Sequence, residues 1–402
     1  MSIPIPADAD PRSSTGDVHT SVTRLADGRE LIYYDRAPVR RDSWPDRRDL
    51  PDRPATGSAR LDPRTGDWVI VATHRQNRIF LPAATDCPLC PSLDGRQTEV
   101  PAPDYAVVVF ENRFPALVGA ATGAVRPAPV DGVAGAVDPV AGPGPLAPTA
   151  DTGADLLAEM PATGRCEVVC FDSRHDVTFA GLDTDQAGLA LAAWSDRTRA
   201  LSARPDIRQV YCFENRGPEI GVTQHHPHGQ IYAYPFVLPR TRRMLDRAAA
   251  HRAAHGSNLF DDLVAAETAD GSRIVAENDH WTAFVPFAAR WPYEVHLYPR
   301  RRVPDLPHLD PGARAALTPI YLDLLRRFDR LFDAPAPYIA AWHQAPDAPG
   351  AAEFALHLEL FTNRRTSSKL KYLAGTESGM DAFSNDIVPE EAARRLREVG
   401  AA

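Results

Sequence analysis

Short runs of β-branched, aliphatic and aromatic residues, separated by polar turns, predict most of the strands of this chain. We expect strands at residues 67–72, 105–110, 166–171, 208–213, 226–234, 281–286, 293–298, 338–343 and 354–361. Apolar positions at helical spacing predict helices over residues 184–203 and 310–332, and residues 239–255 and 389–399 favour two more. Strands joined by short loops, with helices between groups of strands, are typical of an α+β fold with a mainly antiparallel sheet.

Two segments lack these patterns. Residues 1–55 are rich in Asp, Arg and Pro, so we expect an irregular N-terminal extension. Residues 119–161 consist mostly of Ala, Gly, Pro and Val, with almost no aromatic side chains, which indicates a flexible insertion. Both segments are therefore predicted to lie outside the regular sheet and helices.

The bulk composition limits the partners and the compartment. A chain of 402 residues is long enough for two domains, and its net charge of -9 without a basic stripe makes a nucleic-acid partner unexpected. No apolar run approaches the roughly 18 residues of a membrane span, and the polar N-terminus has no secretory signal pattern. We expect a cytoplasmic protein without membrane contact, in which five cysteines do not indicate a disulfide framework.

The most informative motif is His-Pro-His-Gly-Gln at residues 226–230. Alternate side chains of an extended strand share one face at roughly 7 Å spacing, so His226, His228 and Gln230 are expected to point the same way. The His228 imidazole can attack phosphorus, because a pKa near about 6.5 leaves much of it unprotonated at neutral pH. The Gln230 amide can donate to a phosphoryl oxygen, and Gly229 is expected to let a substrate approach the backbone. The alternative is that the two imidazoles are only a pair of metal ligands.

A second motif indicates a metal site. Cys87 and Cys90 stand in a turn-rich segment at the spacing with which two thiolates hold one Zn²⁺. The chain has no second pair of this kind, so the remaining ligands would be histidines or carboxylates, and His175 and His226 are the candidates. The alternative is a pair of buried thiols without metal. The other cysteines are predicted to be core residues: Cys166, Cys170 and Cys212.

Several polar groups near these motifs could bind phosphate or sugar. Asn215 precedes Arg216 and Gly217 at a strand end, and Gly221 and Thr223 offer backbone N–H groups and a hydroxyl. The alternatives for these residues are an ordinary turn and a plain loop. Arg75 and Arg78 are spaced to clamp an anion, although surface charge is the commoner role of arginine.

Together these motifs resemble the galactose-1-phosphate uridylyltransferase family, a branch of the histidine-triad nucleotidyltransferases. The likeness runs from about residue 60 to the C-terminus and includes residues 62–68, 87–90, 109–114, 213–217, 226–230, 291–294, 341–343 and 371–377. The resemblance implies two similar histidine-triad-like domains, each a mainly antiparallel half-barrel sheet with flanking helices, over residues 56–240 and 241–402. It also implies a homodimer.

The resemblance assigns roles to residues that match the family motifs. It implies zinc ligands at Cys87, Cys90, His175 and His226, a uridylylated nucleophile at His228 and a phosphate partner at Gln230. It also implies a set of substrate-binding residues that contact uridine, phosphate or hexose, partly across the dimer interface: Arg75, Arg78, Asn112, Asn215, Gly221, Thr223, Lys371, Tyr372, Gly375 and Glu377. A second metal site of the family is matched incompletely, because His343 and His357 are present but Glu359 replaces a histidine and Met244 or Leu245 stands where a Glu is expected.

The implied activity is transfer of UMP from UDP-glucose to galactose 1-phosphate by double displacement through a uridylyl-histidine, with one structural Zn²⁺. Three alternatives stay open at this point. One is a related transferase or phosphorylase that uses an adenine nucleotide, and another is a hydrolase that passes the nucleotide to water. The third is a zinc-stabilised binding protein without turnover, although simple binding needs neither His228 nor Gln230.

Overall fold

The strands form one large and one small sheet, in a computed structural model that describes residues 18–51, 57–73, 82–93, 95–119, 156–332 and 334–401. Paired strands are antiparallel throughout both sheets. The small sheet has the order β4 (Asp67–Val71), β3 (Ser58–Asp62) and β6 (Glu159–Pro161). The large sheet has the order β1 (His19–Arg24), β2 (Glu30–Asp35), β5 (Val107–Glu111), β7 (Arg165–Cys170), β9 (His228–Tyr234), β8 (Gln209–Arg216), β13 (Tyr338–His343), β14 (His357–Thr362), β12 (Tyr293–Pro299), β11 (Trp281–Phe284) and β10 (Ile274–Glu277).

The helices begin and end at residues that suit helix termini. Asp183 accepts a hydrogen bond from the backbone of Gln186 at the start of α1, and Asp310 accepts one from Ala313 at the start of α4. Gly256 takes the left-handed conformation that ends α2. The described α-helices are α1 (Thr184–Ser202), α2 (Pro239–His255), α3 (Leu259–Asp270), α4 (Pro311–Arg330), α5 (Gly375–Met380) and α6 (Pro389–Ala401).

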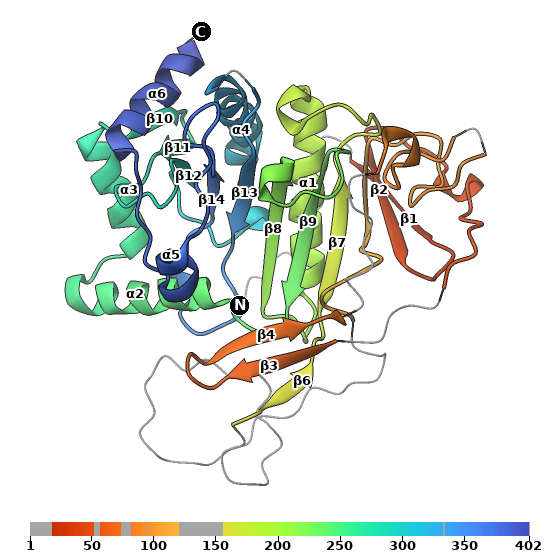
Figure 1. The fold of residues 1–402 in the computed structure, drawn as a ribbon, viewed down its shortest axis with the longest axis horizontal. Helices are drawn as coiled ribbons and strands as arrows, with labels where there is room; N and C mark the ends of the chain where they lie inside the picture. Colours follow the sequence, from red (N-terminus) through yellow and green to blue (C-terminus); the bar gives the residue numbers. More distant parts are fainter. Residues whose placement is uncertain are drawn as a thin grey trace, which may run out of the picture.

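One hydrophobic cluster joins the large sheet to α1 and α4, which pack against each other (Figure 1). Trp194 of α1 and Tyr321 of α4 are fully buried in this cluster with Trp342 of β13. The opposite faces of β8 and β9 therefore remain available for polar chemistry, because side chains alternate between the two faces of a strand.

The large sheet contains the same topology twice. In the first half the chain runs β5, β7, α1, β8, β9 and the strands lie in the order β5-β7-β9-β8. In the second half it runs β11, β12, α4, β13, β14 and the strands lie in the order β11-β12-β14-β13. The halves meet where β8 pairs with β13, so they share one continuous sheet. This confirms the predicted sheet-dominated fold of two similar units. The predicted boundary between residues 240 and 241 falls in the first turn of α2 and stays a prediction.

The predicted irregular extension is wrong for residues 19–35, whereas residues 36–51 contain no strand and only the short 3-10 helix Arg41–Ser43. β1 and β2 pair with each other, and β2 pairs with β5 of the large sheet. The run Leu31–Tyr34 is buried on both faces of β2. The high charge of this segment does not reflect solvation, because its buried arginines bind carboxylates: Arg29 contacts Glu99, and Arg41 contacts Asp35.

The predicted flexible insertion, residues 119–161, is wrong at its C-terminal end. Residues 159–161 form β6, which pairs with β3 in the small sheet. Residues 120–155 lie outside the described residues. The strand was missed because it has only three residues and one of them is Pro161, at an edge position that does not require an N–H donor.

Candidate functional site

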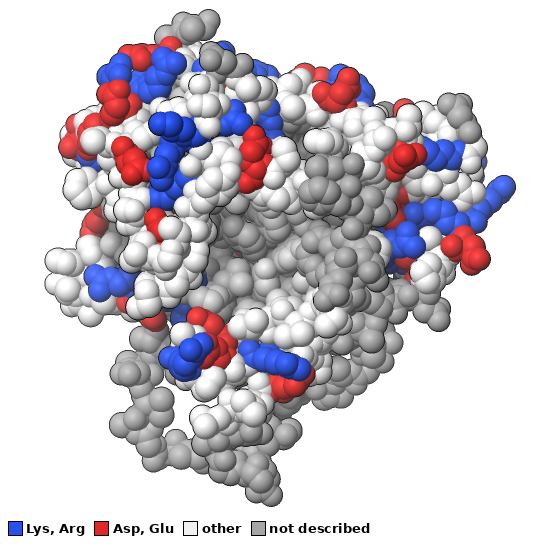
Figure 2. Space-filling view, in the orientation of Figure 1, with Lys and Arg blue, Asp and Glu red and all other residues white. Residues whose placement is uncertain are grey.

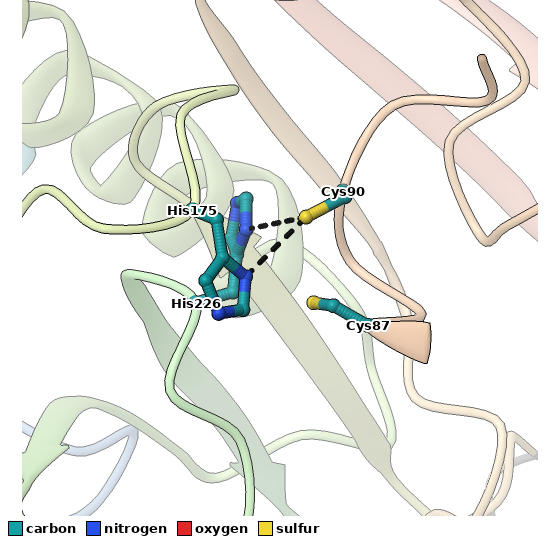
Figure 3. A group of neighbouring side chains, drawn as sticks. All are labelled: Cys87, Cys90, His175 and His226. Atoms are coloured by element: carbon teal, nitrogen blue, oxygen red, sulfur yellow. Dashed lines mark hydrogen bonds between the residues drawn. The ribbon is translucent and has the colours of Figure 1, made fainter. Parts of the chain in front are cut away.

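Four predicted metal ligands come together between three separate segments. Cys87 and Cys90 lie in the loop before β5, His175 follows β7, and His226 lies two residues before β9. Their ligand atoms all lie within 4.8 Å of one another, and the side chains point toward a common centre (Figure 3). The Cys90 sulfur is 3.4 Å from His175 Nδ1 and 3.5 Å from His226 Nδ1. Two thiols and two imidazoles in this arrangement match the donor set of a closed zinc site.

The protonation of these groups also suits a cation. Burial lowers the pKa of His226 to about 3 and lowers the pKa of His175, so both rings are neutral at physiological pH. Burial raises the pKa of the Cys87 thiol to about 12, so a nearby cation is needed to hold it as thiolate. His226 Nε2 lies 2.9 Å from the Asp172 carbonyl oxygen and 2.6 Å from the Tyr105 hydroxyl, which leaves Nδ1 to face the thiols. The residues present therefore fit Zn²⁺.

His228 and Gln230 occupy one face of β9. The strand alternates between partly exposed and buried residues from His228 to Tyr234, and both side chains are on the partly exposed face. His228 Nδ1 lies 2.7 Å from the backbone oxygen of His226, so Nδ1 carries the proton and the lone pair is on Nε2. The tautomer that a nucleophilic imidazole needs is thus set by the backbone next to the metal cluster.

The strand at this motif is shorter than expected, and one other expectation about it is wrong. β9 begins at His228, but the His226 ring contacts Cys90 and Tyr105, which pack in one hydrophobic cluster with Val168 and Cys170, the β7 partners of Gln230 and His228. His226 therefore lies on the same side of the sheet as His228 and Gln230, as predicted. Gly229 does not open the backbone to a substrate. A Cβ at this position would lie 2.7 Å from the Phe171 ring, so the glycine is required by packing on the opposite face of the strand.

A cavity of about 310 Å³ lies over the partly exposed face of β9. The cavity is lined by six residues for which the sequence predicts a role in catalysis or binding: Asn112, Asn215, Gly221, Thr223, His228 and Gln230. Sequence reasoning missed the apolar and charged wall of the cavity: Pro88, Leu89, Glu99, Phe110, Arg113, Phe114, Val168, Phe213, Val222, Gln224 and Tyr232. The available signal was that alternate side chains of β5, β7, β8 and β9 share a face. This signal identifies the cavity wall only when the pairing of the strands is known.

Other predicted binding residues lie elsewhere. Lys371 and Tyr372 precede α5, Gly375 and Glu377 lie in α5, and none of the four lines this cavity. Lys371 is buried and hydrogen-bonded to the Ser384 carbonyl, whereas Tyr372 is 72% exposed. Arg75 and Arg78 lie outside the described residues.

A second polar cluster lies in the C-terminal half. His343, His357 and Glu359 place one ligand atom each within 4.8 Å of one another, and Glu294, His296 and Glu359 form an overlapping group that the sequence did not predict. Glu359 Oε1 is 2.7 Å from the guanidinium of Arg240, closer than any imidazole nitrogen of the cluster. Glu359, which stands where the resemblance implies a histidine ligand, is therefore next to the cationic side chain of Arg240.

Comparison with known proteins agrees with this geometry. Two family models match the chain: "Galactose-1-phosphate uridyl transferase, N-terminal domain" over residues 49–238 and "Galactose-1-phosphate uridyl transferase, C-terminal domain" over residues 245–402. The chain belongs to the galactose-1-phosphate uridylyltransferase family. It is therefore a uridylyltransferase-family enzyme.

Two relatives in the galactose-1-phosphate uridylyltransferase family cover most of the chain. The enzyme of Streptomyces lividans is 47% identical over 389 residues, 94% of this chain and 97% of the relative. The enzyme of Thermotoga maritima is 35% identical over 342 residues, 84% of this chain and 97% of the relative. A solved uridylyltransferase structure superposes with a TM-score of 0.69 at 31% identity, covering 86% of this chain and 98% of that structure.

Proposed function

We propose that this enzyme transfers UMP from UDP-glucose to galactose 1-phosphate through a covalent uridylyl-histidine, giving UDP-galactose and glucose 1-phosphate. The observation that carries the proposal is the position of His228, with the lone pair on Nε2, in the same cavity as Gln230. The names of the Streptomyces and Thermotoga relatives support the substrate class.

The first displacement begins at His228 Nε2. The lone pair attacks the α-phosphorus of UDP-glucose, the bond from this phosphorus to the bridging oxygen breaks, and glucose 1-phosphate leaves with the electron pair. The Nδ1 proton stays hydrogen-bonded to the His226 carbonyl. This hydrogen bond stabilises the positive charge that the His228 ring acquires. In the second displacement a phosphate oxygen of galactose 1-phosphate attacks the same phosphorus, and the nitrogen–phosphorus bond breaks.

Gln230 is placed to stabilise the crowded phosphorus in both steps. It shares the partly exposed face of β9 with His228, so its amide N–H can donate to a non-bridging oxygen as charge builds on it. Gly221 and Thr223 lie across the cavity and offer a backbone N–H and a hydroxyl to the phosphates. The aromatic wall, which includes Phe110 and Phe213, suits the uracil and ribose of the nucleotide.

We infer that Zn²⁺ binds Cys87, Cys90, His175 and His226 in a structural role. A bound zinc ion would supply charge and fixed geometry, and four protein ligands leave no position for an activated water. The ion would join the loop of Cys87 and Cys90 to His226, two residues before β9. Because the His226 carbonyl holds His228, this joint also fixes the orientation of the nucleophile.

We also propose a cytoplasmic homodimer. The segment around α5 exposes Tyr372 and Met380, which are 72% and 80% exposed, next to the buried Lys371. A second copy of the chain would cover these exposed side chains and bring residues 371–377 next to a neighbouring active site. Five free thiols suit a reducing compartment. No described helix is both long and apolar enough to cross a bilayer, and Figure 2 shows charges of both signs interspersed on the visible face.

Replacing the nucleophile tests the reaction, with the adjacent histidine as control. His228→Gly should abolish exchange of glucose 1-phosphate into UDP-glucose. His225→Gly should retain this exchange, because His225 is exposed and does not line the 310 Å³ cavity. Retained exchange in His228→Gly contradicts the proposal, and so does labelling of the protein by an adenine nucleotide in preference to a uracil nucleotide.

A further inference from the structure

The N-terminal segment, residues 18–51, lies beside the cavity although most of it precedes the residues that the N-terminal family model matches. That match begins at residue 49, whereas β1 and β2 occupy residues 19–35 at one end of the large sheet (Figure 1). Leu31 of β2 is opposite Phe110 of β5, and Phe110 lines the cavity. The segment is therefore placed to influence the cavity wall.

Five charged side chains of alternating sign form a row at this junction. Arg29 Nε lies 2.6 Å from Asp27, and Arg29 Nη2 lies 2.7 Å from Glu99 Oε2. Arg48 Nη1 lies 2.9 Å from Glu99 Oε1, and Arg48 Nη2 lies 2.8 Å from Asp46. All five side chains are between 1% and 11% exposed. Four of the five belong to the N-terminal segment, and Glu99 alone belongs to the loop that follows Cys90.

Glu99 connects this row to both the cavity and the metal loop. Glu99 is one of the residues that line the 310 Å³ cavity, and its backbone N–H donates to the Pro88 carbonyl at 2.9 Å, between the two cysteines. The hydroxyl of the neighbouring Thr98 donates to the Cys90 carbonyl at 2.6 Å. A shift of Glu99 would therefore move the loop that carries Cys87 and Cys90.

The charge of Glu99 matters for a nucleotide. A carboxylate in the wall of a cavity that receives phosphates would repel them, and the repulsion is stronger where water is excluded. Here each carboxylate oxygen accepts a charge-assisted hydrogen bond from an arginine of the N-terminal segment. Asp27 and Asp46 also bind these two arginines, so the guanidiniums offset part of the charge of the Glu99 carboxylate and fix its position.

We propose that Arg29 and Arg48 are positioning residues of the nucleotide cavity. They offset the charge of Glu99 and hold the loop of Cys87 and Cys90, so that the cavity accepts an anionic nucleotide. The N-terminal segment is thus part of the active-site scaffold. This inference rests on the proposed function, because it assumes that the cavity binds a uracil nucleotide.

Arg29→Met tests the inference, and Arg41→Met is a matched control. Both arginines are buried, at 2% and 4% exposed, and each binds carboxylates and one backbone carbonyl. The carboxylates of Arg41 are Asp35 and Asp104, which do not line the cavity. We expect Arg29→Met to weaken the binding of UDP about tenfold and the binding of uridine much less. Calorimetry measures both affinities. Arg41→Met should leave both affinities within about twofold of wild type.

A second substitution separates charge from folding. Glu99→Gln in the Arg29→Met background removes the uncompensated charge, so it should restore most of the UDP affinity. In turnover, Arg29→Met should raise KM for UDP-glucose more than it lowers kcat, because the substitution leaves His228 and Gln230 of β9 in place. If Arg29→Met does not fold, Arg48→Met serves in its place, since the Arg48 side chain is 11% exposed and easier to truncate.

Three outcomes would overturn the inference. These are unchanged UDP affinity in the folded variant, equal losses in Arg29→Met and Arg41→Met, and a double variant that binds UDP no better than Arg29→Met. The proposed function fails separately. A wild-type chain that binds UDP with this dependence on Arg29 but transfers no uridylyl group would refute the reaction and leave the positioning role intact.

Discussion

The buried carboxyl of Glu214 should make the enzyme less stable as the pH rises, and Glu214→Gln should remove this effect. Glu214 lies on β8 opposite Ala340 of β13, where the two halves of the sheet meet, and it is 4% exposed. Its Oε1 accepts a hydrogen bond from the Tyr338 hydroxyl at 3.1 Å, and its Oε2 has no hydrogen-bond partner among the described residues. Burial raises the pKa of this carboxyl from 4.5 to about 8.

Proton linkage gives the sign and the size of the change in unfolding free energy that Glu214 causes. Between pH 4.5 and pH 8 the unfolded chain has released the proton while the folded chain retains it, so rising pH favours unfolding. Each pH unit in this window removes about 1.4 kcal/mol of stability. Between about pH 6 and pH 9 only the two units below the folded pKa count, so wild type should lose about 3 kcal/mol more than Glu214→Gln.

Urea unfolding at the two pH values measures this difference. Glu219→Gln is the control, because Glu219 is paired with Arg364 and partly exposed. We expect this control to follow the wild-type pH dependence. Equal pH dependence in wild type and Glu214→Gln would refute the reasoning and would mean that the folded chain holds Glu214 ionised.

The other predictions concern the strand of the nucleophile and the metal cluster. Gln230→Ala should lower kcat about 10²–10³-fold with little change in KM, and unchanged kcat in steady-state assays would contradict its role. Gly229→Ala places a Cβ 2.7 Å from Phe171 Cζ, so the free energy of unfolding should fall by about 1–3 kcal/mol; urea denaturation with wild-type stability would refute this. Tyr105→Phe removes the hydroxyl between His226 and the Leu89 carbonyl, so a chromophoric chelator should extract zinc about tenfold faster. Tyr33→Phe, in the same hydrophobic cluster, should not change the rate, and equal rates in the two variants would count against the role of Tyr105.

Local chemistry made the active strand and the helices predictable from sequence. The alternation of residues 228–234 predicted that His228 and Gln230 share a face, and it depends only on strand geometry. α2 spans the predicted residues 239–255, because Pro239 suits the first helical position and Gly256 suits the end. Cys87 and Cys90 were recognisable because two ligands of one metal lie close in sequence.

Features that depend on long-range pairing were not predictable. The Asp, Arg and Pro content of residues 1–55 suggested an irregular extension, and only the folded chain shows the carboxylates that bind Arg29 and Arg41. Glu99 had no motif that linked it to the cavity.

The most direct test of the central claim is the intact mass of the protein after incubation with UDP-glucose alone. A histidine that carries the nucleotide predicts a mass gain of one uridylyl group on wild type, mapped to His228, and its loss on addition of galactose 1-phosphate with release of UDP-galactose. Wild-type protein that turns over the substrates without this adduct, or that carries it on another residue, would contradict the account.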